Sequence, residues 1–190
     1  MFVFIDTETG GLDAAEVSLL TVAAAIVDDQ FNVLDKISFG VKPEVYVISP
    51  GAIAVNKIDL AEHAKCSMTP HKAGETLAEF LHTGVILANN DRLIPAGHNV
   101  AFDLNFIWRQ LMPEEEWKKY CAYPALDTAA LARFFYTAKL IPAAFNLVAL
   151  RQLFNIDTGE AHDAMNDVLA SVEVAKKFSE LVLPQLSSIS

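Results

Sequence analysis

Residues 2–12 read FVFIDTETGGL, an apolar run that leads directly into two acidic residues and a pair of glycines. The run predicts a buried β-strand. Alternate side chains of a strand lie on one face, so Asp6 and Glu8 are expected to project together. Gly10 and Gly11 let another chain approach the backbone closely. Two carboxylates at a strand end suit a hard dication such as Mg²⁺ or Mn²⁺, although an Asp-x-Glu pair also occurs on solvated strand ends.

A third acidic residue, Asp103, follows a second predicted strand. Residues 92–97 read RLIPAG, a short buried strand, and apolar residues at helical spacing follow from position 102. Asp103 therefore falls in the first turn of a helix just beyond a strand end, where ligands commonly gather in α/β sheets. Taken alone, Asp103 is also interpretable as a carboxylate favoured by the helix dipole, and His98 and Asn99 as turn residues.

The C-terminal part of the chain carries a histidine and a further aspartate in AHDAMNDV, residues 161–168. Apolar residues at helical spacing from Met165 onward predict a long amphipathic helix that contains Asp167. His162 precedes Asp167 by about 140° of helical rotation, so the two converge only if His162 lies in the preceding loop. Asp163 is a suitable N-cap for a helix that begins after His162. The alternative is an exposed loop histidine beside an ordinary surface aspartate.

These three motifs, in this order, resemble those of the DEDDh 3′–5′ exonucleases, the DnaQ-like or RNase T superfamily. The family's Asp-x-Glu motif is matched by FIDTETGGL at 4–12 and its His-Asn-x-x-Phe-Asp motif by HNVAFD at 98–103. Its third motif, a histidine followed five residues later by an aspartate, is matched by HDAMND at 162–167. The resemblance covers about residues 2–180, and three ordered motifs are far more specific than one.

The segments between the motifs also resemble the family. ALDTAALAR at 125–133 looks like its strand and Asp-Thr helix start, and FNLVALRQLFNI at 145–156 looks like the helix before its third motif. One departure lies at residues 56–58, which read NKI where the family often has His-Gly-Ile or Asn-Gly-Ile. This leaves open how the terminal nucleotide is held on that side, and Lys57 could instead supply a phosphate contact.

The resemblance implies an RNase H-like α/β fold and hydrolysis of phosphodiester bonds with two Mg²⁺ or Mn²⁺ ions. In that scheme Asp6 bridges both ions, Glu8 and Asp167 complete one site, and Asp103 holds the other ion largely through water. His162 is the candidate general base. The expected metal ligands are thus Asp6, Glu8, Asp103 and Asp167, and the expected catalytic residues are these four and His162.

The resemblance also implies a pocket for the 3′-terminal nucleotide of single-stranded DNA or RNA, with DNA favoured because the first motif is closest to the proofreading branch. Leu12 is expected to pack on the base, with backbone groups near the sugar. The residues expected to line this pocket are Thr9, Gly10, Gly11, Leu12, Asn99, Phe102 and Phe106. The apolar members of this set could equally be core.

The hydrophobic pattern predicts three early strands joined as an antiparallel meander, followed by alternating helices and strands. Such an order gives a mixed sheet flanked by helices, with the later strands parallel. The cluster Phe134, Phe135 and Tyr136 is predicted to be core rather than a base-stacking platform. The expected strands are 2–6, 17–28, 32–42, 93–97 and 123–126, and the expected helices are 70–83, 101–112, 127–138, 146–154 and 163–182.

Composition indicates one compact enzyme-sized domain. The chain has 190 residues, 53% of them apolar, enough to bury a core. We expect a single domain at 1–182 and a short tail at 183–190. The longest apolar stretch, 17–27, is too short to cross a bilayer. Cys66 and Cys121 lack metal-ligand spacing and are expected to be reduced thiols in a cytoplasmic protein, and the N-terminus lacks the basic region of a signal peptide.

Net charge constrains the partners. The 24 acidic and 14 basic residues give a formal charge of −10, opposite to the footprint of a protein that grips a phosphate backbone. Bound dications would reverse the field locally, so we expect short-footprint binding of a strand end. A polymerase partner or a homodimer stays open. Two rival functions are a non-catalytic nucleic-acid-end-binding or polymerase accessory protein and an RNase H-like endonuclease.

Overall fold

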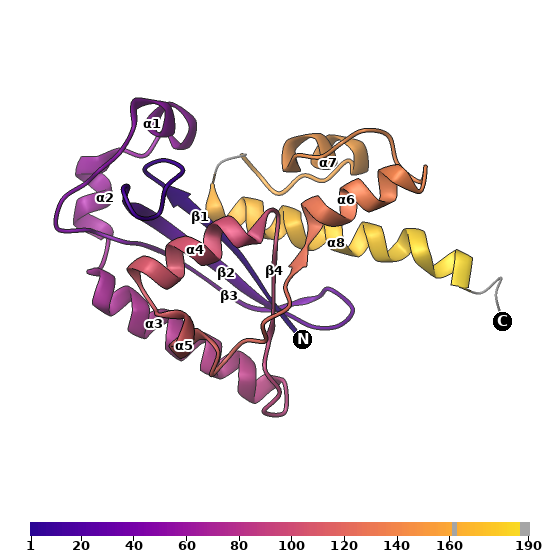
Figure 1. Ribbon diagram of the computed structural model, residues 1–190, viewed down its shortest axis with the longest axis horizontal. Helices are drawn as coiled ribbons and strands as arrows, with labels where there is room; N and C mark the ends of the chain where they lie inside the picture. Colours follow the sequence, from indigo (N-terminus) through magenta and orange to yellow (C-terminus); the bar gives the residue numbers. More distant parts are fainter. Residues whose placement is uncertain (161–162, 187–190) are drawn as a thin grey trace.

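The computed structural model describes residues 1–160 and 163–186, which form one five-stranded mixed sheet with helices on both faces (Figure 1). The strand order is β3-β2-β1-β4-β5. The first three strands pair antiparallel, and β4 and β5 add to β1 in parallel. The predicted mixed sheet is therefore confirmed. The strands are β1 (Phe2–Thr9), β2 (Leu19–Val27), β3 (Val33–Gly40), β4 (Ile94–Gly97) and β5 (Leu126–Asp127).

The eight helices of the described chain alternate with these strands. Pro50 and Pro70 occupy first-turn positions behind Ser49 and Thr69, whose side chains cap the helices that they precede, because proline is tolerated where no N–H partner is needed. The helices are α1 (Pro50–Asn56), α2 (Leu60–Cys66), α3 (Pro70–Leu87), α4 (Val100–Gln110), α5 (Glu114–Trp117), α6 (Thr128–Thr137), α7 (Leu147–Phe154) and α8 (Ala164–Leu186).

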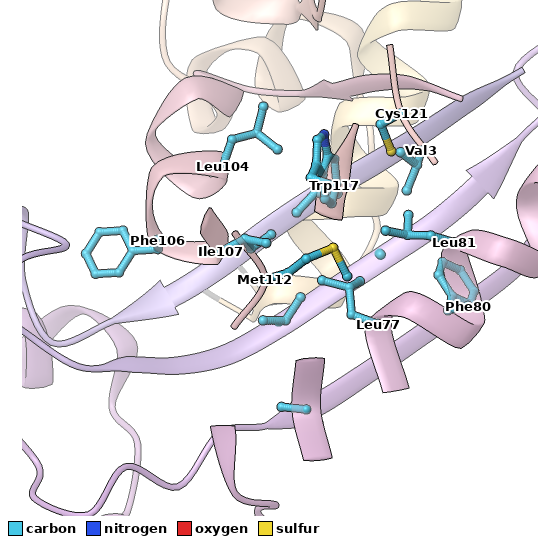
Figure 2. Packing of buried hydrophobic residues seen from close by; sticks show 14 of the residues in the cluster. Val3, Leu77, Phe80, Leu81, Leu104, Phe106, Ile107, Met112, Trp117 and Cys121 are labelled. Carbon is cyan, nitrogen blue, oxygen red and sulfur yellow. The ribbon is translucent and has the colours of Figure 1, made fainter. Parts of the chain in front are cut away.

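Strand β1 is central and sends alternate side chains into two different cores. Val3 and Ile5 belong to the cluster that includes α3 and α4, where Trp117 and Ile107 are buried (Figure 2). Phe4 belongs to the cluster on the opposite face, formed with α8. Both faces of β1 are therefore covered, which explains why its sequence reads as a continuous apolar run rather than an alternating one.

The sequence pattern missed three short helices, α1, α2 and α5, and shortened three longer elements. Helices of four to seven residues carry too few apolar positions for a periodic signal, yet the cap residues Ser49 and Asp59 were present. Strand β1 continues to Thr9, three residues past the expected end, and α3 continues to Leu87. Helix α8 extends to Leu186, into the segment expected to be a tail.

The cluster Phe134, Phe135 and Tyr136 corrects another expectation. Phe135 is buried, but Phe134 is 64% exposed and Tyr136 is 45% exposed. Consecutive residues of a helix point about 100° apart, so three in a row cannot all face the core. Only Phe135 stacks on Phe178 of α8.

Two other expectations concern cysteines and membrane spans. Both cysteines are free thiols; Cys66 is exposed, and burial raises the pKa of the Cys121 thiol. Over the part of the chain that the structure describes, no helix combines the length and apolarity needed to cross a membrane.

Candidate active site

Four of the five expected catalytic residues meet at the C-terminal edge of β1 and β4. Asp6 and Glu8 continue the face of β1 that Phe4 shares with α8, while Asp103 comes from α4 and Asp167 from the first turn of α8. The charges of Asp103, Asp167 and Glu8 all act on Asp6. Side chains that are far apart in the sequence are thus electrostatic neighbours.

Asp103 is held by the strand that it faces. Its Oδ1 accepts a 2.7 Å hydrogen bond from the hydroxyl of Thr7, and the backbone of Thr7 also bonds to this carboxylate. Asp103 lies in the first turn of α4 and is almost completely buried. A carboxylate in the first turn of a helix is stabilised by the helix dipole. Asp103 therefore fits the helix-start interpretation and also lies where a metal ligand is expected.

The acidic side chains share an environment that disfavours their charged forms. Desolvation by burial, and then the charges of Asp103, Asp167 and Glu8, raise the pKa of Asp6 well above its usual range. Desolvation and nearby acids raise the pKa of Glu8 to about 8. Desolvation also raises the pKa of Asp103 to about 7, although the Thr7 hydrogen bonds oppose the rise. Clustered carboxylates with raised pKa values are typical of functional sites.

A fifth carboxylate, Asp163, belongs to the same electrostatic group. Its charge raises the pKa of both Asp6 and Glu8. The Asp163 side chain accepts from the backbone N–H of Asn166, and its carbonyl accepts from Asp167, which matches its predicted role as N-cap of α8. The sequence indicates the cap but not the electrostatic effect on Asp6 and Glu8, because spacing along the chain does not show which strand the cap faces.

His162, the candidate general base, lies outside the described residues. The structure therefore describes its neighbours in sequence, Glu160 and Asp163, and leaves its role as a prediction from the third motif.

His98 and Asn99 form the turn that joins β4 to α4, and their contacts reach the start of α6. His98 Nδ1 is 3.0 Å from the hydroxyl oxygen of Thr128, and that hydroxyl donates to the Gly97 carbonyl. Asn99 adopts the left-handed conformation, and its backbone N–H donates to Asp127. These contacts tie the turn to Asp127 and Thr128, 28 and 30 positions later in the sequence, rather than to the local backbone groups of the turn interpretation. Asn99 is exposed, and its expected contact with substrate stays a prediction.

A cavity of about 420 Å³ opens beside the carboxylates. Glu8 lies in its wall, so the cavity and the acidic group share a side chain. Leu12 stands at its rim with 88% of its surface exposed. The lining residues are Thr7, Glu8, Thr9, Gly11, Leu12, Ser49, Gly51, Ala52, Val55, Asn56 and Phe102. Four of the expected pocket residues, Thr9, Gly11, Leu12 and Phe102, are therefore brought together.

Two of the expected pocket residues, Gly10 and Phe106, do not line this cavity. Gly10 is buried against the chain's own segment at residues 47–49: a Cβ atom there would lie 2.3 Å from the Val47 carbonyl oxygen, and Ser49 donates its N–H to the Gly10 carbonyl. The segment that approaches the backbone of Gly10 is thus residues 47–49 of the same chain. Phe106 is completely buried in the core, with its ring 5.1 Å from that of Phe102, so it supports the pocket from behind.

Another wall of the cavity comes from α1, a helix that was not predicted from the sequence. Asn56 donates from its side-chain amide to the Thr9 carbonyl and accepts from the Ile58 N–H. This residue therefore ties α1 to the end of β1, one position before the sequence departs from the family. Lys57 follows in the left-handed conformation, where the family often has glycine, and it is exposed.

The acidic group fits hard divalent cations by its chemistry. Its donors are carboxylate oxygens, which Mg²⁺ and Mn²⁺ prefer, and their mutually raised pKa values show negative charge that nearby cations would neutralise. Within residues 1–160 and 163–186, no three Asp, Glu, His or Cys side chains are grouped closely enough to hold one ion as they stand. Repulsion among unneutralised carboxylates opposes such a grouping.

A mixed sheet with this strand order, and acidic side chains from β1, α4 and α8 at one edge, defines a nuclease of the RNase H-like fold. Residues 3–175 match the family model RNase_T, described as an exonuclease. The chain belongs to that family, which is metal-dependent, and is a hydrolytic 3′–5′ exonuclease of the DnaQ-like or RNase T superfamily.

Similar proteins agree with this assignment. Ribonuclease T of Shewanella denitrificans is 28% identical over 179 residues, which is 90% of this chain and 77% of that protein. E. coli exonuclease I in complex with a dT13 oligonucleotide has the same fold, with a TM-score of 0.81, 23% identity and 98% of this chain covered. A zinc-bound exonuclease I–ssDNA complex superposes with a TM-score of 0.73 at 26% identity and 97% coverage. The chain spans 42% and 40% of those two exonuclease I chains.

Proposed function

We propose that this protein removes nucleotides one at a time from the 3′ end of single-stranded nucleic acid, with DNA favoured over RNA, and releases nucleoside 5′-monophosphates. Two Mg²⁺ or Mn²⁺ ions are the proposed cofactors. The proposal is narrower than membership of the family, because it names the strand, the products and the metal ions.

The observation that carries the proposal is the position of Glu8. This residue interacts electrostatically with Asp103 and Asp167 and also lines the cavity that holds Leu12 and Phe102. A nucleotide seated against Leu12 and Phe102 therefore has its phosphate side beside the acidic group. Large apolar side chains at a cavity rim suit the flat face of a base, which every nucleotide presents.

The single-stranded, 3′-terminal substrate is supported by the shape of the site and by the relatives. A 420 Å³ cavity is within the size range of small-ligand pockets, which suits one terminal nucleotide. The exonuclease I complexes were obtained with single-stranded oligonucleotides. The net charge of −10 favours a substrate gripped over a few phosphates.

The roles of the residues follow from this arrangement. When bound, two divalent cations supply an activated water and stabilise the leaving 3′ oxygen. Asp6, Glu8 and Asp167 are the proposed ligands of one ion, and Asp103, oriented by Thr7, is the proposed ligand of the other, with Asp6 shared. His162 is the proposed base that takes the proton from the attacking water at an imidazole nitrogen.

The cellular setting is also proposed. Two free cysteines favour a reducing compartment, and we propose the cytoplasm. For protein partners, either a polymerase or a second copy of this chain is proposed. Sedimentation of the purified chain, alone and with the candidate polymerase, distinguishes these two.

A single assay tests the activity. The chain is incubated with a 5′-labelled single-stranded DNA 20-mer, with the matched RNA, and with each oligomer blocked at its 3′ end. We expect a ladder of products shortened by one nucleotide, no reaction on the blocked oligomers, loss of reaction with a chelator and recovery with Mn²⁺ or Mg²⁺. Release of mononucleotides is measured separately by chromatography.

The rival functions give other results in the same assay. Internal cuts that persist on blocked oligomers indicate an endonuclease. Binding of the free 3′ end without any product, at every metal concentration, indicates a non-catalytic end-binding protein. Faster degradation of RNA than of DNA contradicts the proposed DNA preference but leaves the exonuclease activity intact.

A further inference from the structure

We propose that Arg151 of α7 is a positioning residue for the active site, which holds Asp167 and the loop at residues 157–160 in place. This inference rests on the proposed function, since it concerns how Asp167 is presented to the metal ion. Arg151 touches neither a reacting atom nor the nucleotide cavity, and it acts through Asp167.

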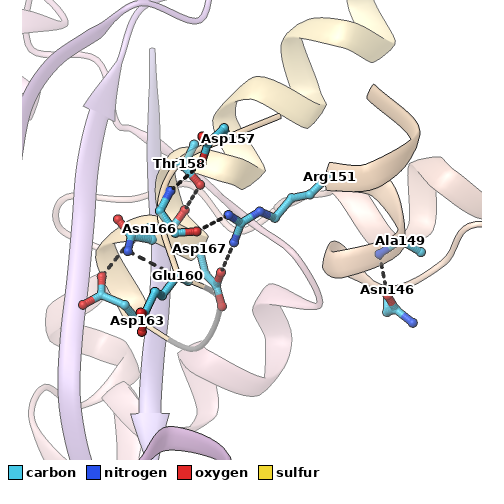
Figure 3. A network of polar contacts seen from close by, with 10 residues as sticks. Asn146, Ala149, Arg151, Asp157, Thr158, Glu160, Asp163, Asn166 and Asp167 are labelled. Carbon is cyan, nitrogen blue, oxygen red and sulfur yellow. Dashed lines mark hydrogen bonds and ion pairs between the residues drawn. The ribbon is translucent and has the colours of Figure 1, made fainter. Parts of the chain in front are cut away.

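The guanidinium group of Arg151 makes two contacts on different parts of the chain (Figure 3). Its Nη1 lies 3.4 Å from Oδ1 of Asp167. Its Nη2 donates to the backbone carbonyl of Gly159. One planar group therefore connects three segments: helix α7, the loop that follows it, and the first turn of α8.

This ion pair is largely shielded from solvent, unlike an ion pair on the open surface. The side chain of Arg151 is 11% exposed and that of Asp167 is 13% exposed. Removing one partner of a buried pair leaves an uncompensated charge, which is far more costly than losing a surface pair. Arginine suits the position because its rigid fork of N–H donors reaches two acceptors at once, whereas the lysine ammonium is a single point.

The loop is also tied to α8 from its other side. Asn166, the residue before Asp167, donates from its side chain to the Glu160 carbonyl, and its own carbonyl accepts from the Thr158 hydroxyl. Gly159 has φ +102°, and a Cβ atom there would lie 2.7 Å from Nδ2 of Asn166. The loop thus packs directly on the helix turn that carries Asp167, with Arg151 closing the contact from α7.

The contacts of Arg151 bear on both functional residues of the third motif, His162 and Asp167. Asp167 is the proposed ligand, and the loop held at Gly159 leads in sequence to His162. Partners that orient a ligating carboxylate commonly change metal affinity or activity by 10- to 100-fold when removed. We therefore expect loss of Arg151 to weaken metal binding and to leave the nucleotide cavity unchanged.

The test compares three variants with the wild-type chain. Arg151→Gln removes the charge and the fork, and Arg151→Lys keeps the charge but can satisfy only one acceptor. Arg133→Gln is the matched control, because Arg133 is exposed and, among the residues that the structure describes, bonds to the Ala129 carbonyl of its own helix. Mn²⁺ binding is measured by calorimetry without nucleic acid, and hydrogen exchange is measured at residues 157–160.

We expect Arg151→Gln to bind Mn²⁺ about 10- to 100-fold more weakly and to exchange amides at 157–160 faster. Arg151→Lys should fall between Arg151→Gln and wild type, and Arg133→Gln should match wild type. A wild-type Mn²⁺ affinity in Arg151→Gln overturns the inference, even if its melting temperature falls, since a purely structural role lowers stability without changing affinity. If Arg151→Gln does not fold, Asn166→Ala tests the same loop from the α8 side.

Failure of the inference differs from failure of the proposed function. Unchanged affinity in Arg151→Gln together with metal-dependent release of mononucleotides by the wild-type chain rejects only the role of Arg151. A wild-type chain that binds no Mn²⁺ in calorimetry and releases no nucleotide rejects the proposed function, and this inference with it.

Discussion

The hydroxyl of Thr7 donates a 2.7 Å hydrogen bond to the buried carboxylate of Asp103, which lies 96 positions later in the sequence. Strand β1 thus presents carboxylates on one face, at Asp6 and Glu8, and from its other face orients the carboxylate of α4. Successive side chains of a strand point to opposite faces, which places Asp6 and Glu8 on one face of β1 and Thr7 on the other.

Thr7→Val tests this relationship. Loss of the hydroxyl removes a hydrogen bond to a charged group, worth about 1.5–3 kcal/mol, and leaves Asp103 less well oriented. We expect Mn²⁺ to bind about tenfold more weakly by calorimetry. Thr83→Val is the control, because Thr83 is exposed on α3 and its described hydrogen bond goes to the Glu79 carbonyl of the same helix. Equal affinities in Thr7→Val and wild type contradict the expectation.

Stability of the metal-free protein is expected to fall as the pH rises. The folded-state pKa values of Glu8 and Asp103 are raised, to about 8 and about 7 from ordinary values of 4.5 and 3.8. Between these limits the folded protein keeps protons that the unfolded chain has released, so the free energy of unfolding decreases with rising pH. The contribution is fully present below about pH 4 and lost by about pH 8.

Urea unfolding with chelator at pH 5, 6, 7 and 8 measures this dependence. Glu8→Gln should flatten it and be more stable than wild type at pH 8, by about 1 kcal/mol or more given the partial exposure of the site. Glu79→Gln, an exposed change on α3, should leave the slope unchanged. If the free energy of unfolding of the wild-type protein rises from pH 5 to pH 8, Glu8 and Asp103 do not dominate the pH dependence of its stability.

Leu12→Ala tests the nucleotide cavity. Leu12 is 88% exposed and contributes little to folding, but covering it with a base would bury apolar surface worth about 1.5 kcal/mol or more. We expect KM for a single-stranded oligonucleotide to rise about tenfold with an unchanged melting temperature. Leu34→Ala on strand β3, where the side chain is 49% exposed, is the control. An unchanged KM in Leu12→Ala removes Leu12 from the substrate site.

His162→Ala tests the general base. Turnover should fall by about 10²- to 10⁴-fold, the usual effect of losing such a group, while Mn²⁺ binding persists. Asp6→Ala should abolish both, because Asp6 is the proposed shared ligand. His71→Ala, an exposed substitution at a histidine beside Glu75, should change neither. Full activity in His162→Ala would end the base assignment.

Much of this site was readable from the sequence because its residues follow local rules. Asp6 and Glu8 lie two apart after an apolar run, Asp103 lies in a helix first turn, and Asp167 lies one turn into a long amphipathic helix. Each placement depends on neighbours within about ten residues, which periodicity and capping signals describe. The mixed sheet was predicted from the order of strands and helices, each of which has its own local pattern.

Other parts of the site depend on contacts between distant segments. Gly10 is packed against residues 47–49, so the freedom of that glycine serves the fold rather than the substrate. Asn56 closes the cavity through its bond to Thr9. Short helices such as α1 have no periodic signal, and no local rule says which loop will cover a glycine.

The sequence by itself thus determined the fold class and the local placement of Asp6, Glu8, Asp103 and Asp167, because strand alternation and helix starts are local properties of the chain. Their assignment to one site came from the resemblance of the three motifs to the DEDDh exonucleases. Only the tertiary structure decided which side chains orient them: Thr7 for Asp103, Arg151 for Asp167, and Asp163 as an additional charge beside Asp6. Desolvation and Coulomb energies depend on distance in space, and residues far apart in sequence acquire that distance only when the sheet and its helices pack together.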